Sequence, residues 1–228
     1  MTGLSVILPV YNEEQCIERV LCDVSRFLAS QKYFADYEII AVNDGSSDNT
    51  EKILLDCQSR LPRLSILTQK ANAGYGGTLL AGIKKSRHSW ILLMDADGQL
   101  DIRDMERFIP YMRDYSMIIG YRQKRNDPLF RIILGKVFSC LVYGLFDLRL
   151  KDVNCGFKLI KKESLVWENI CSKAGVFYTE ALLQARRQGF SIKEIPVRHR
   201  IRQKGSATGA SPKVVFDAIL DLAKLKFC

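Results

Sequence analysis

An apolar run ends on two carboxylates in the stretch Trp90-Ile-Leu-Leu-Met-Asp-Ala-Asp-Gly-Gln99. A short run this apolar is typical of a strand that is buried on both faces of a parallel sheet. Ligands of open α/β sheets collect beyond the carboxyl ends of the strands, so Asp95 and Asp97 are expected where a hard cation and a phosphorylated ligand would bind. Two plainer interpretations stay open at this point: Asp101 caps a helix, or the acids belong to a solvated turn around Gly98.

Strands and helices alternate along the rest of the first half. Apolar runs predict strands at 4–10, 37–43, 64–68 and 117–120. Helical spacing of apolar residues predicts helices at about 12–30, 48–61, 78–86 and 102–112, the first two capped by Asn12 and Asp48. This alternation predicts an α/β fold with a mainly parallel central sheet and helices on both faces. Since no linker divides the sequence, we expect one domain over residues 1–228.

A second acid follows the strand at 37–43. Asp44 stands before a glycine, as Asp97 does, and an Asx turn is the alternative explanation for it. Further on, the stretch Asn72-Ala-Gly-Tyr-Gly-Gly77 lacks the spacing of a dinucleotide-binding fingerprint, and no acid lies about 20 residues beyond it. Its glycines are expected to allow a close approach of the backbone to a ligand or a helix.

The second half contains an unusually apolar segment at 129–148, interrupted by Arg131 and Lys136. The pattern is typical of a helix in a membrane interface, and a buried core or dimer helix is the alternative. Beyond it we expect a turn at 152–158, a strand at 157–160, a helix at 179–188, a strand at 191–197 and a final helix at 214–226. The basic loop 198–212 has no apolar period and is expected to be mobile unless a ligand orders it.

The composition limits the class of protein. With 228 residues and 47% hydrophobic residues, the chain can bury a core of its own. It has no run of 18 uninterrupted apolar residues and no charged, cleavable leader, so we expect it to be neither secreted nor integral to a membrane. The seven cysteines are scattered without a Cys-x-x-Cys pair, which disfavours a disulfide framework and a zinc site and favours reduced thiols.

The net charge of +9 comes from two segments. Residues 121–136 contribute five basic residues against one acid, and residues 198–213 contribute five basic residues without an acid. Localised positive charge indicates an anionic partner, namely a nucleic acid, a phosphorylated ligand or an anionic membrane surface. The basic segments lack interleaved aromatic residues for stacking bases, so nucleic acid is not expected as a partner.

Five motifs, taken in order, resemble those of the family 2 glycosyltransferases of the GT-A fold, and within that family the polyprenol-phosphate sugar transferases such as the dolichyl-phosphate mannose or glucose synthases. The motifs are Val6-Ile-Leu-Pro-Val-Tyr-Asn-Glu-Glu14, Val42-Asn-Asp-Gly-Ser-Ser-Asp48, Asp95-Ala-Asp-Gly-Gln99, Gly120-Tyr-Arg122 and Asp152-Val-Asn-Cys-Gly-Phe157. The resemblance covers nearly the whole chain. It implies a single Rossmann-like GT-A domain, with a nucleotide-sugar-binding half at 1–122 and an acceptor-side half at 123–228.

The resemblance also implies roles for individual residues. The expected nucleotide-sugar site comprises Pro9, Tyr11, Glu13, Val42, Asp44, Asp95, Ala96 and Asp97. The expected metal ligands are Asp97 and Gln99, with Asp95 completing the acidic pair, and the metal is Mg²⁺ or Mn²⁺ because all of these side chains offer oxygen. Arg122 resembles the family's diphosphate-binding arginine, and Arg202 its acceptor-phosphate-binding arginine. The usual Gly-Glu-Ser-Lys after Arg202 is here Gly205-Ser-Ala-Thr208, so Lys204 is the substitute for the missing lysine.

The expected reaction is metal-dependent, inverting transfer of a hexose from a GDP- or UDP-linked sugar to a polyprenyl or dolichyl phosphate. The metal and Arg122 would neutralise the diphosphate leaving group. A lipid phosphate is already ionised and needs no general base, whereas a glycan or protein hydroxyl, the alternative acceptor, would need Glu180 as base. A helix-start acid is the other explanation for Glu180. A protein of this kind would be cytoplasmic and peripheral on the cytoplasmic membrane face, with a membrane-protein partner or a homodimer left open, and a non-catalytic scaffold is the alternative from another class.

Overall fold

The computed structural model describes residues 2–172, 175–202 and 212–227. Its centre is a seven-stranded sheet in the order β3-β2-β1-β4-β6-β5-β7. Four of the six neighbouring strand pairs are parallel, and β6 runs antiparallel between β4 and β5. The strands are β1 (Thr2–Val10), β2 (Phe34–Asn43), β3 (Leu64–Thr68), β4 (Trp90–Leu93), β5 (Met117–Arg122), β6 (Lys158–Lys161) and β7 (Ile192–Val197). The predicted α/β class is confirmed, with one antiparallel strand inside the sheet.

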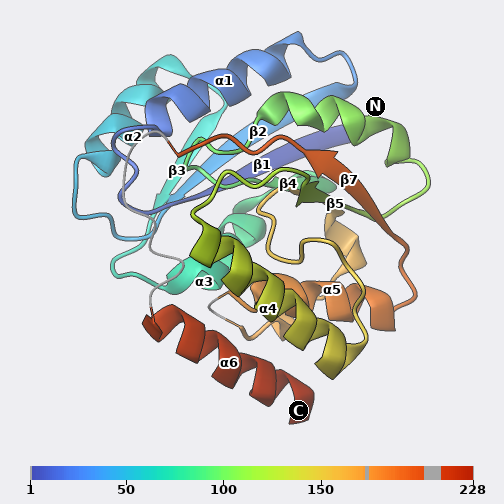
Figure 1. Cartoon of the computed structure of the whole chain (residues 1–228). Helices are drawn as coiled ribbons and strands as arrows, with labels where there is room; N and C mark the ends of the chain where they lie inside the picture. Colours follow the sequence, from blue (N-terminus) through green and yellow to red (C-terminus); the bar gives the residue numbers. More distant parts are fainter. Residues whose placement is uncertain (1, 173–174, 203–211, 228) are drawn as a thin grey trace.

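Helices cover both faces of this sheet, as predicted (Figure 1). One face carries α1 (Ile17–Ser30) and α2 (Thr50–Arg60), and the other carries α3 (Gly74–Lys85) and α5 (Phe177–Arg187). The alternation of side chains along β1 explains the two cores: Val6 and Leu8 pack with α1, whereas Ile7 between them packs with α3. Farther out on the α3 side lie α4 (Leu129–Phe146) and α6 (Pro212–Phe227).

Three predicted helix starts differ from the structure. Asn12 does not cap a helix, because its backbone is left-handed (φ 54°) and its side-chain oxygen accepts from the amide of Ser47 at 2.8 Å, so α1 begins only at Ile17. Asp48 lies one residue before the N-cap of α2 and accepts from the amide of Thr50 at 3.0 Å. The helix predicted to begin at residue 78 begins at Gly74.

The segment after the acidic pair forms 3₁₀ turns instead of the expected α-helix. The turns are η1 (Ile102–Arg107) and η2 (Ile109–Tyr111). Asp101 caps η1, since its carboxylate accepts from the amide of Arg103 at 3.1 Å. Pro110 has no amide hydrogen to donate and therefore cannot continue an α-helix.

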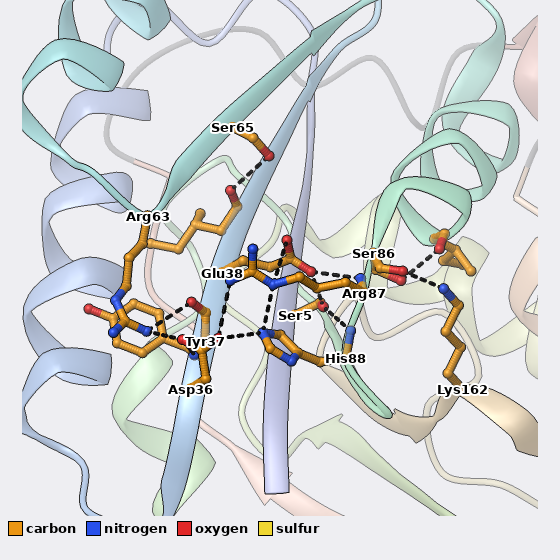
Figure 2. A network of polar contacts seen from close by, with 12 residues as sticks. Ser5, Asp36, Tyr37, Glu38, Arg63, Ser65, Ser86, Arg87, His88 and Lys162 are labelled. Atoms are coloured by element: carbon orange, nitrogen blue, oxygen red, sulfur yellow. Dashed lines mark hydrogen bonds and ion pairs between the residues drawn. The ribbon is translucent and has the colours of Figure 1, made fainter.

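A polar network fastens the sheet at the edge where β1 and β2 begin (Figure 2). The Ser5 hydroxyl donates to the Glu38 carboxylate at 2.6 Å, and the backbone amide of Arg87 donates to the same oxygen at 2.8 Å. The Lys162 ammonium donates to the Ser86 carbonyl and so joins the segment after β6 to the turn before β4. These contacts all lie at the edge where β1 and β2 begin, and none lies at the opposite edge, where the parallel strands end.

The apolar helix α4 lies on the surface. Of its 18 residues only Val142 and Phe146 are buried, which excludes the buried-core alternative and leaves the membrane-interface prediction and the dimer alternative open. By length and composition α4 is the one helix among the described residues that could cross a membrane, with a mean hydropathy of 1.8 and 11% of it buried. The expectation of no span rested on an uninterrupted run, and Arg131 and Lys136 break that run without lowering the average below the range of spanning helices.

The second half continues the same sheet. Both β6 and β7 pair with β5, so the two predicted halves share one sheet. The predicted strands and helices at 157–160, 179–188, 191–197 and 214–226 correspond to β6, α5, β7 and α6. Of the expected basic loop 198–212, residues 203–211 and with them Lys204 lie outside the described residues.

Candidate active site

The acids that follow two strands come together at the carboxyl edge of the sheet. Both β2 and β4 are parallel to β1 and lie on either side of it, so their ends meet at this edge. Asp44 follows β2, and the pair Asp95 and Asp97 follows β4. This is the place where open α/β sheets bind their ligands, as the sequence predicts.

Asp95 is held between two segments of the chain. Its Oδ1 accepts from the Tyr75 hydroxyl at 2.5 Å. A Cβ atom added to Gly156 would come within 2.0 Å of Oδ2, so the backbone of the turn before β6 packs directly against the carboxylate. Burial raises the pKa of Asp95 to about 6, and the negative charge of Asp97 adds to this rise. The two carboxylates are therefore close enough to repel each other.

Asp97 faces a basic side chain from the other end of the chain. Its Oδ1 accepts from the amide of Gln99 at 3.0 Å, and its Oδ2 accepts from Nη1 of Arg202 at 3.3 Å. Arg202 also donates through Nη2 to Glu13 at 2.6 Å. Burial raises the pKa of Glu13, although the Cys16 thiol and Arg202 act against this rise. Residues from the first loop, the acidic pair and the segment after β7 thus form one cluster.

Gln99 ties the acidic pair to the basic segment. The side-chain Nε2 of Gln99 donates to the backbone carbonyl of Arg200 at 3.1 Å. The backbone carbonyl of Gln99 accepts from the backbone amide of Arg200 at 2.8 Å. Leu100 and His199 form an antiparallel bridge beside it. The structure therefore holds residues 198–202 against the strand-end loop of β4.

Arg122, the residue predicted to bind the diphosphate, forms an ion pair with Asp152. Its Nε and Nη2 donate to the Asp152 carboxylate at 2.7 and 2.9 Å, and its amide donates to the same group at 3.2 Å. Both side chains are largely buried, 15% and 11% exposed. Burial acts against the charged form, but the contacts with Asp152 outweigh it and raise the pKa of Arg122 above its usual value. The guanidinium is thus fixed at the end of β5 by the turn before β6.

Asp44 has a structural role at the start of α3. Its two carboxylate oxygens accept from the amides of Ala73 and Gly74 at 2.7 and 3.2 Å and so cap the N-terminus of α3. Among the other predicted nucleotide-site residues, Val42 is fully buried, Ala96 is buried, Pro9 is half-buried and Tyr11 is 38% exposed. Pro9 and Val42 are register partners in β1 and β2, so both lie near the same edge.

Glu180, the predicted base of the hydroxyl-acceptor alternative, also binds backbone amides. Its carboxylate accepts from Cys171 at 3.0 Å and from Ser172 at 2.8 Å. These bonds hold the segment before α5, and no bond of Glu180 to Asp95, Asp97, Arg122 or Arg202 occurs among the described residues.

The structure adds four residues that sequence reasoning missed. Tyr75 and Tyr178 form a hydrogen-bonded pair with Asp95, their hydroxyls 2.8 Å apart. Lys158 is 1% exposed and donates to the carbonyls of Val153 and Cys155, and burial lowers its pKa to about 8. His199 is buried, accepts at Nδ1 from the amide of Asn126 at 3.2 Å, and has its pKa lowered by burial and by the charge of Arg122.

Signals for three of these four residues were present in the sequence. Tyr75 is the only aromatic residue in the glycine-rich stretch 72–77, and Lys158 directly follows the 152–157 motif at the start of an apolar strand. His199 is one of only two histidines. For Tyr178 the sequence offers no comparable signal, because the position reads as an ordinary core residue of α5.

The acidic pair fits a hard cation that takes further ligands from a substrate. No group of three or more His, Cys, Asp and Glu side chains that could hold a metal occurs in the described ranges 2–172, 175–202 and 212–227. Magnesium is typically held by one or two carboxylates together with waters and substrate phosphates, so two mutually repelling carboxylates suffice. A cation between Asp95 and Asp97 would relieve their repulsion.

Comparisons with known proteins identify the family of the chain. The family model "Glycosyl transferase family 2" matches residues 5–172. The dolichyl-phosphate beta-glucosyltransferase ALG5A of Trichomonas vaginalis is 32% identical over 210 residues, 85% of this chain and 64% of that protein. The dolichyl-phosphate beta-glucosyltransferase of Saccharomyces cerevisiae is 30% identical over 85% of this chain and 66% of its own length. The chain thus spans slightly less than two thirds of the length of the curated relatives it matches.

A solved structure shows the same fold. Glucosyl-3-phosphoglycerate synthase from Mycobacterium tuberculosis, crystallised with Mn²⁺, UDP and phosphoglyceric acid, superposes with a TM-score of 0.75 at 14% identity, over 99% of this chain and 78% of that one. The match to the family model covers well over half of the sequence and includes every motif that places the acidic pair. The chain therefore belongs to glycosyl transferase family 2.

Proposed function

We propose that this protein transfers glucose from a nucleotide-diphosphate sugar to dolichyl phosphate or a related polyprenyl phosphate. One observation carries the proposal: Asp97, at the carboxyl edge of the sheet, contacts Arg202, so the group for the donor's cation and the group for an anionic acceptor meet at one point. The curated relatives, named as dolichyl-phosphate beta-glucosyltransferases, support the sugar and the acceptor.

Asp95 and Asp97 hold the Mg²⁺ or Mn²⁺ in this proposal, with Gln99 beside them. The bound metal supplies positive charge to the diphosphate leaving group. Arg122, fixed by Asp152, adds charge from the neighbouring strand end. The nucleotide base and ribose lie along the ends of β1 and β2, against Pro9, Tyr11, Glu13, Val42, Asp44 and Ala96.

The acceptor phosphate binds Arg202 and Lys204. Since a phosphate monoester is ionised near neutral pH, it attacks the sugar carbon without a general base. This agrees with the contacts of Glu180, whose carboxylate binds two backbone amides. Transfer to a glycan or protein hydroxyl is the alternative function, and it requires Glu180 to leave those amides.

The lipid acceptor lies in a membrane, so the protein must bind the membrane surface, and in this proposal it does so through α4. The helix exposes apolar side chains that include Leu129 (72% exposed), Phe130 (60%) and Ile133 (52%). Its basic residues Arg131 and Lys136 suit anionic head groups. We place the protein on the cytoplasmic face, where nucleotide sugars are available, and a dimer through α4 is the other use of this surface.

A lipid-extraction assay tests the proposal. The full chain is incubated with Mn²⁺, dolichyl phosphate and radiolabelled UDP-glucose, with GDP-mannose and UDP-N-acetylglucosamine in parallel, and the organic phase is counted. Labelled lipid from UDP-glucose, and not from the other two donors, is the expected result. Transfer of label to a soluble glycan without any labelled lipid would favour the alternative function. No transfer of label from any of the three donors would favour a non-catalytic scaffold.

A further inference from the structure

We propose that Tyr75 is a positioning residue: its hydroxyl, backed by Tyr178, fixes the orientation in which the Asp95 carboxylate meets the metal–diphosphate of the donor. The inference rests on the proposed function in one respect, since it takes Asp95 as a group that faces the metal. It goes beyond that function because neither the motifs nor the acidic pair assigns a role to these tyrosines.

The hydrogen bonds have one consistent direction. The Tyr75 hydroxyl lies 2.5 Å from Asp95 Oδ1 and 2.8 Å from the Tyr178 hydroxyl. A phenol has one hydrogen to donate, and an ionised carboxylate only accepts. Tyr75 therefore donates to Asp95, and Tyr178 donates to Tyr75. The chain of bonds orients Tyr75 before any ligand arrives.

Packing fixes the two rings as well as their hydroxyls. The ring centroids of Tyr75 and Tyr178 are 5.8 Å apart in an edge-to-face arrangement. The Lys158 ammonium lies 3.9 Å from the centroid of the Tyr178 ring and donates to the carbonyls of Val153 and Cys155. Lys158 thus connects the tyrosine pair to the turn at 152–157, whose Gly156 packs against the Asp95 carboxylate.

That turn also confines Asp95. Any Cβ at position 156 would lie 2.0 Å from Asp95 Oδ2 and 2.2 Å from its carboxyl carbon. Glycine is therefore required at this position by the carboxylate itself. With Oδ1 bound by Tyr75 and the plane limited by Gly156, the carboxylate has little freedom to rotate.

The position of Tyr75 depends on the end of β2. Asp44 accepts from the amides of Ala73 and Gly74 and thereby starts α3 one residue before Tyr75. The glycine-rich stretch thus presents its aromatic residue to Asp95. Asp44, after β2, thus helps to fix the position of Tyr75, and Tyr75 in turn binds Asp95, after β4.

Tyr75→Phe tests the inference because it removes only the hydroxyl. Partners that orient metal-binding groups typically contribute about 10- to 100-fold to metal affinity. We expect Tyr75→Phe to weaken Mn²⁺ binding by about this factor, measured by electron paramagnetic resonance of free Mn²⁺ with and without UDP, and to lower kcat more than it raises the KM for the sugar donor. Tyr178→Phe should produce a smaller loss in the same direction, because it acts through Tyr75.

Tyr33→Phe is the matched control, since Tyr33 is 42% exposed and packs only at the surface, edge-to-face on Phe34. Its Mn²⁺ affinity should equal that of the wild type. A purely structural role for Tyr75 would lower the melting temperature of Tyr75→Phe and leave its Mn²⁺ affinity unchanged, and that result overturns the inference.

Two further results keep the inference separate from the proposed function. Should Tyr75→Phe fail to fold, Tyr178→Phe decides: weaker Mn²⁺ binding supports the positioning role, and unchanged binding overturns it. Failure of the wild type to bind Mn²⁺ even with UDP or GDP overturns the proposed function and the inference together. Normal binding in the wild type and in Tyr75→Phe overturns the inference alone.

Discussion

The guanidinium of Arg202 lies 3.3 Å from the carboxylate of Asp97, although 105 residues separate them in the sequence. Glu13 shares the same guanidinium at 2.6 Å. A positive side chain therefore lies beside Asp97, one of the two carboxylates proposed to hold a divalent cation. A divalent cation bound at Asp97 would therefore compete with the Arg202 guanidinium for the same carboxylate.

Replacing Arg202 by Ala should have two opposite effects. Without its competing charge, Asp97 should bind Mn²⁺ about two- to fivefold more tightly, the range expected for a partly exposed ion pair. The KM for dolichyl phosphate should rise about 10- to 100-fold, since a hydrogen bond to a charged group is lost. Calorimetric Mn²⁺ titration and initial-rate kinetics measure the two effects. Arg26→Ala, at a side chain 79% exposed, is the control, and weaker Mn²⁺ binding in Arg202→Ala would contradict the competition.

Replacing Asp97 by Asn should lower turnover at least about 100-fold, because a neutral amide cannot balance the charge of a metal–diphosphate. The same variant should lose the rise in melting temperature that Mn²⁺ and the donor nucleotide give to the wild type. Thermal shift measures this without any turnover. Asp56→Asn, at an exposed position of α2, should behave like the wild type. A normal metal-dependent shift in Asp97→Asn would reject the metal role.

Replacing Asp152 by Asn should destabilise the protein by about 3 kcal/mol at pH 7, because it leaves the Arg122 guanidinium largely buried without its partner. Burial alone would raise the pKa of Asp152, but the hydrogen bonds and charge of Arg122 outweigh it, so the folded pKa lies below the usual value. Such a group stabilises the fold above its unfolded pKa of about 3.9 and loses this contribution as the pH falls through the folded pKa.

Urea unfolding of the wild type and Asp152→Asn between pH 7 and pH 3 measures this effect. The difference in unfolding free energy should be constant above about pH 5 and shrink below about pH 4. A difference that stays constant through the acid range would show that the lost stability has another source. Asp56→Asn again serves as the control.

Replacing Phe130 and Ile133 by Glu should abolish binding to vesicles of phosphatidylcholine and phosphatidylserine. Each apolar side chain is worth about 1.5–3 kcal/mol on burial, so the affinity should fall more than about tenfold for each. Because both side chains are more than half exposed, the melting temperature should not change. Vesicle co-flotation measures the binding, and Leu55→Glu, 56% exposed on α2, is the control. Undiminished flotation, with a dimer dissociated by the same changes, would assign α4 to self-association.

Replacing Glu180 by Gln should leave transfer to dolichyl phosphate within the range of the wild type. The variant should unfold about 1 kcal/mol more easily, since a neutral amide oxygen accepts less strongly from the amides of Cys171 and Ser172. Rates of lipid labelling and urea unfolding check the two statements. Loss of transfer with unchanged stability would identify Glu180 as a base and favour a hydroxyl acceptor.

Local patterns in the sequence were sufficient for the order of strands and helices and for the acids at the ends of β2 and β4. They misplaced the starts of α1 and α3, because each start depends on a partner in another loop: Ser47 binds Asn12, and Asp44 binds the amides of Ala73 and Gly74. The exposed position of α4 was also undecided, since an apolar helix has the same composition in a core and at a membrane.

The sequence by itself determined the family, the mainly parallel sheet and the candidate metal pair, because short-range periodicity and motif order are properties of the chain. Only the tertiary structure decided which side chains hold that pair. Tyr75, Gly156 and Arg202 reach Asp95 and Asp97 from segments that lie far apart in the sequence. Such contacts are set by the order of strands in the sheet and by the packing of α3 and α5 on one face, and no local pattern records them.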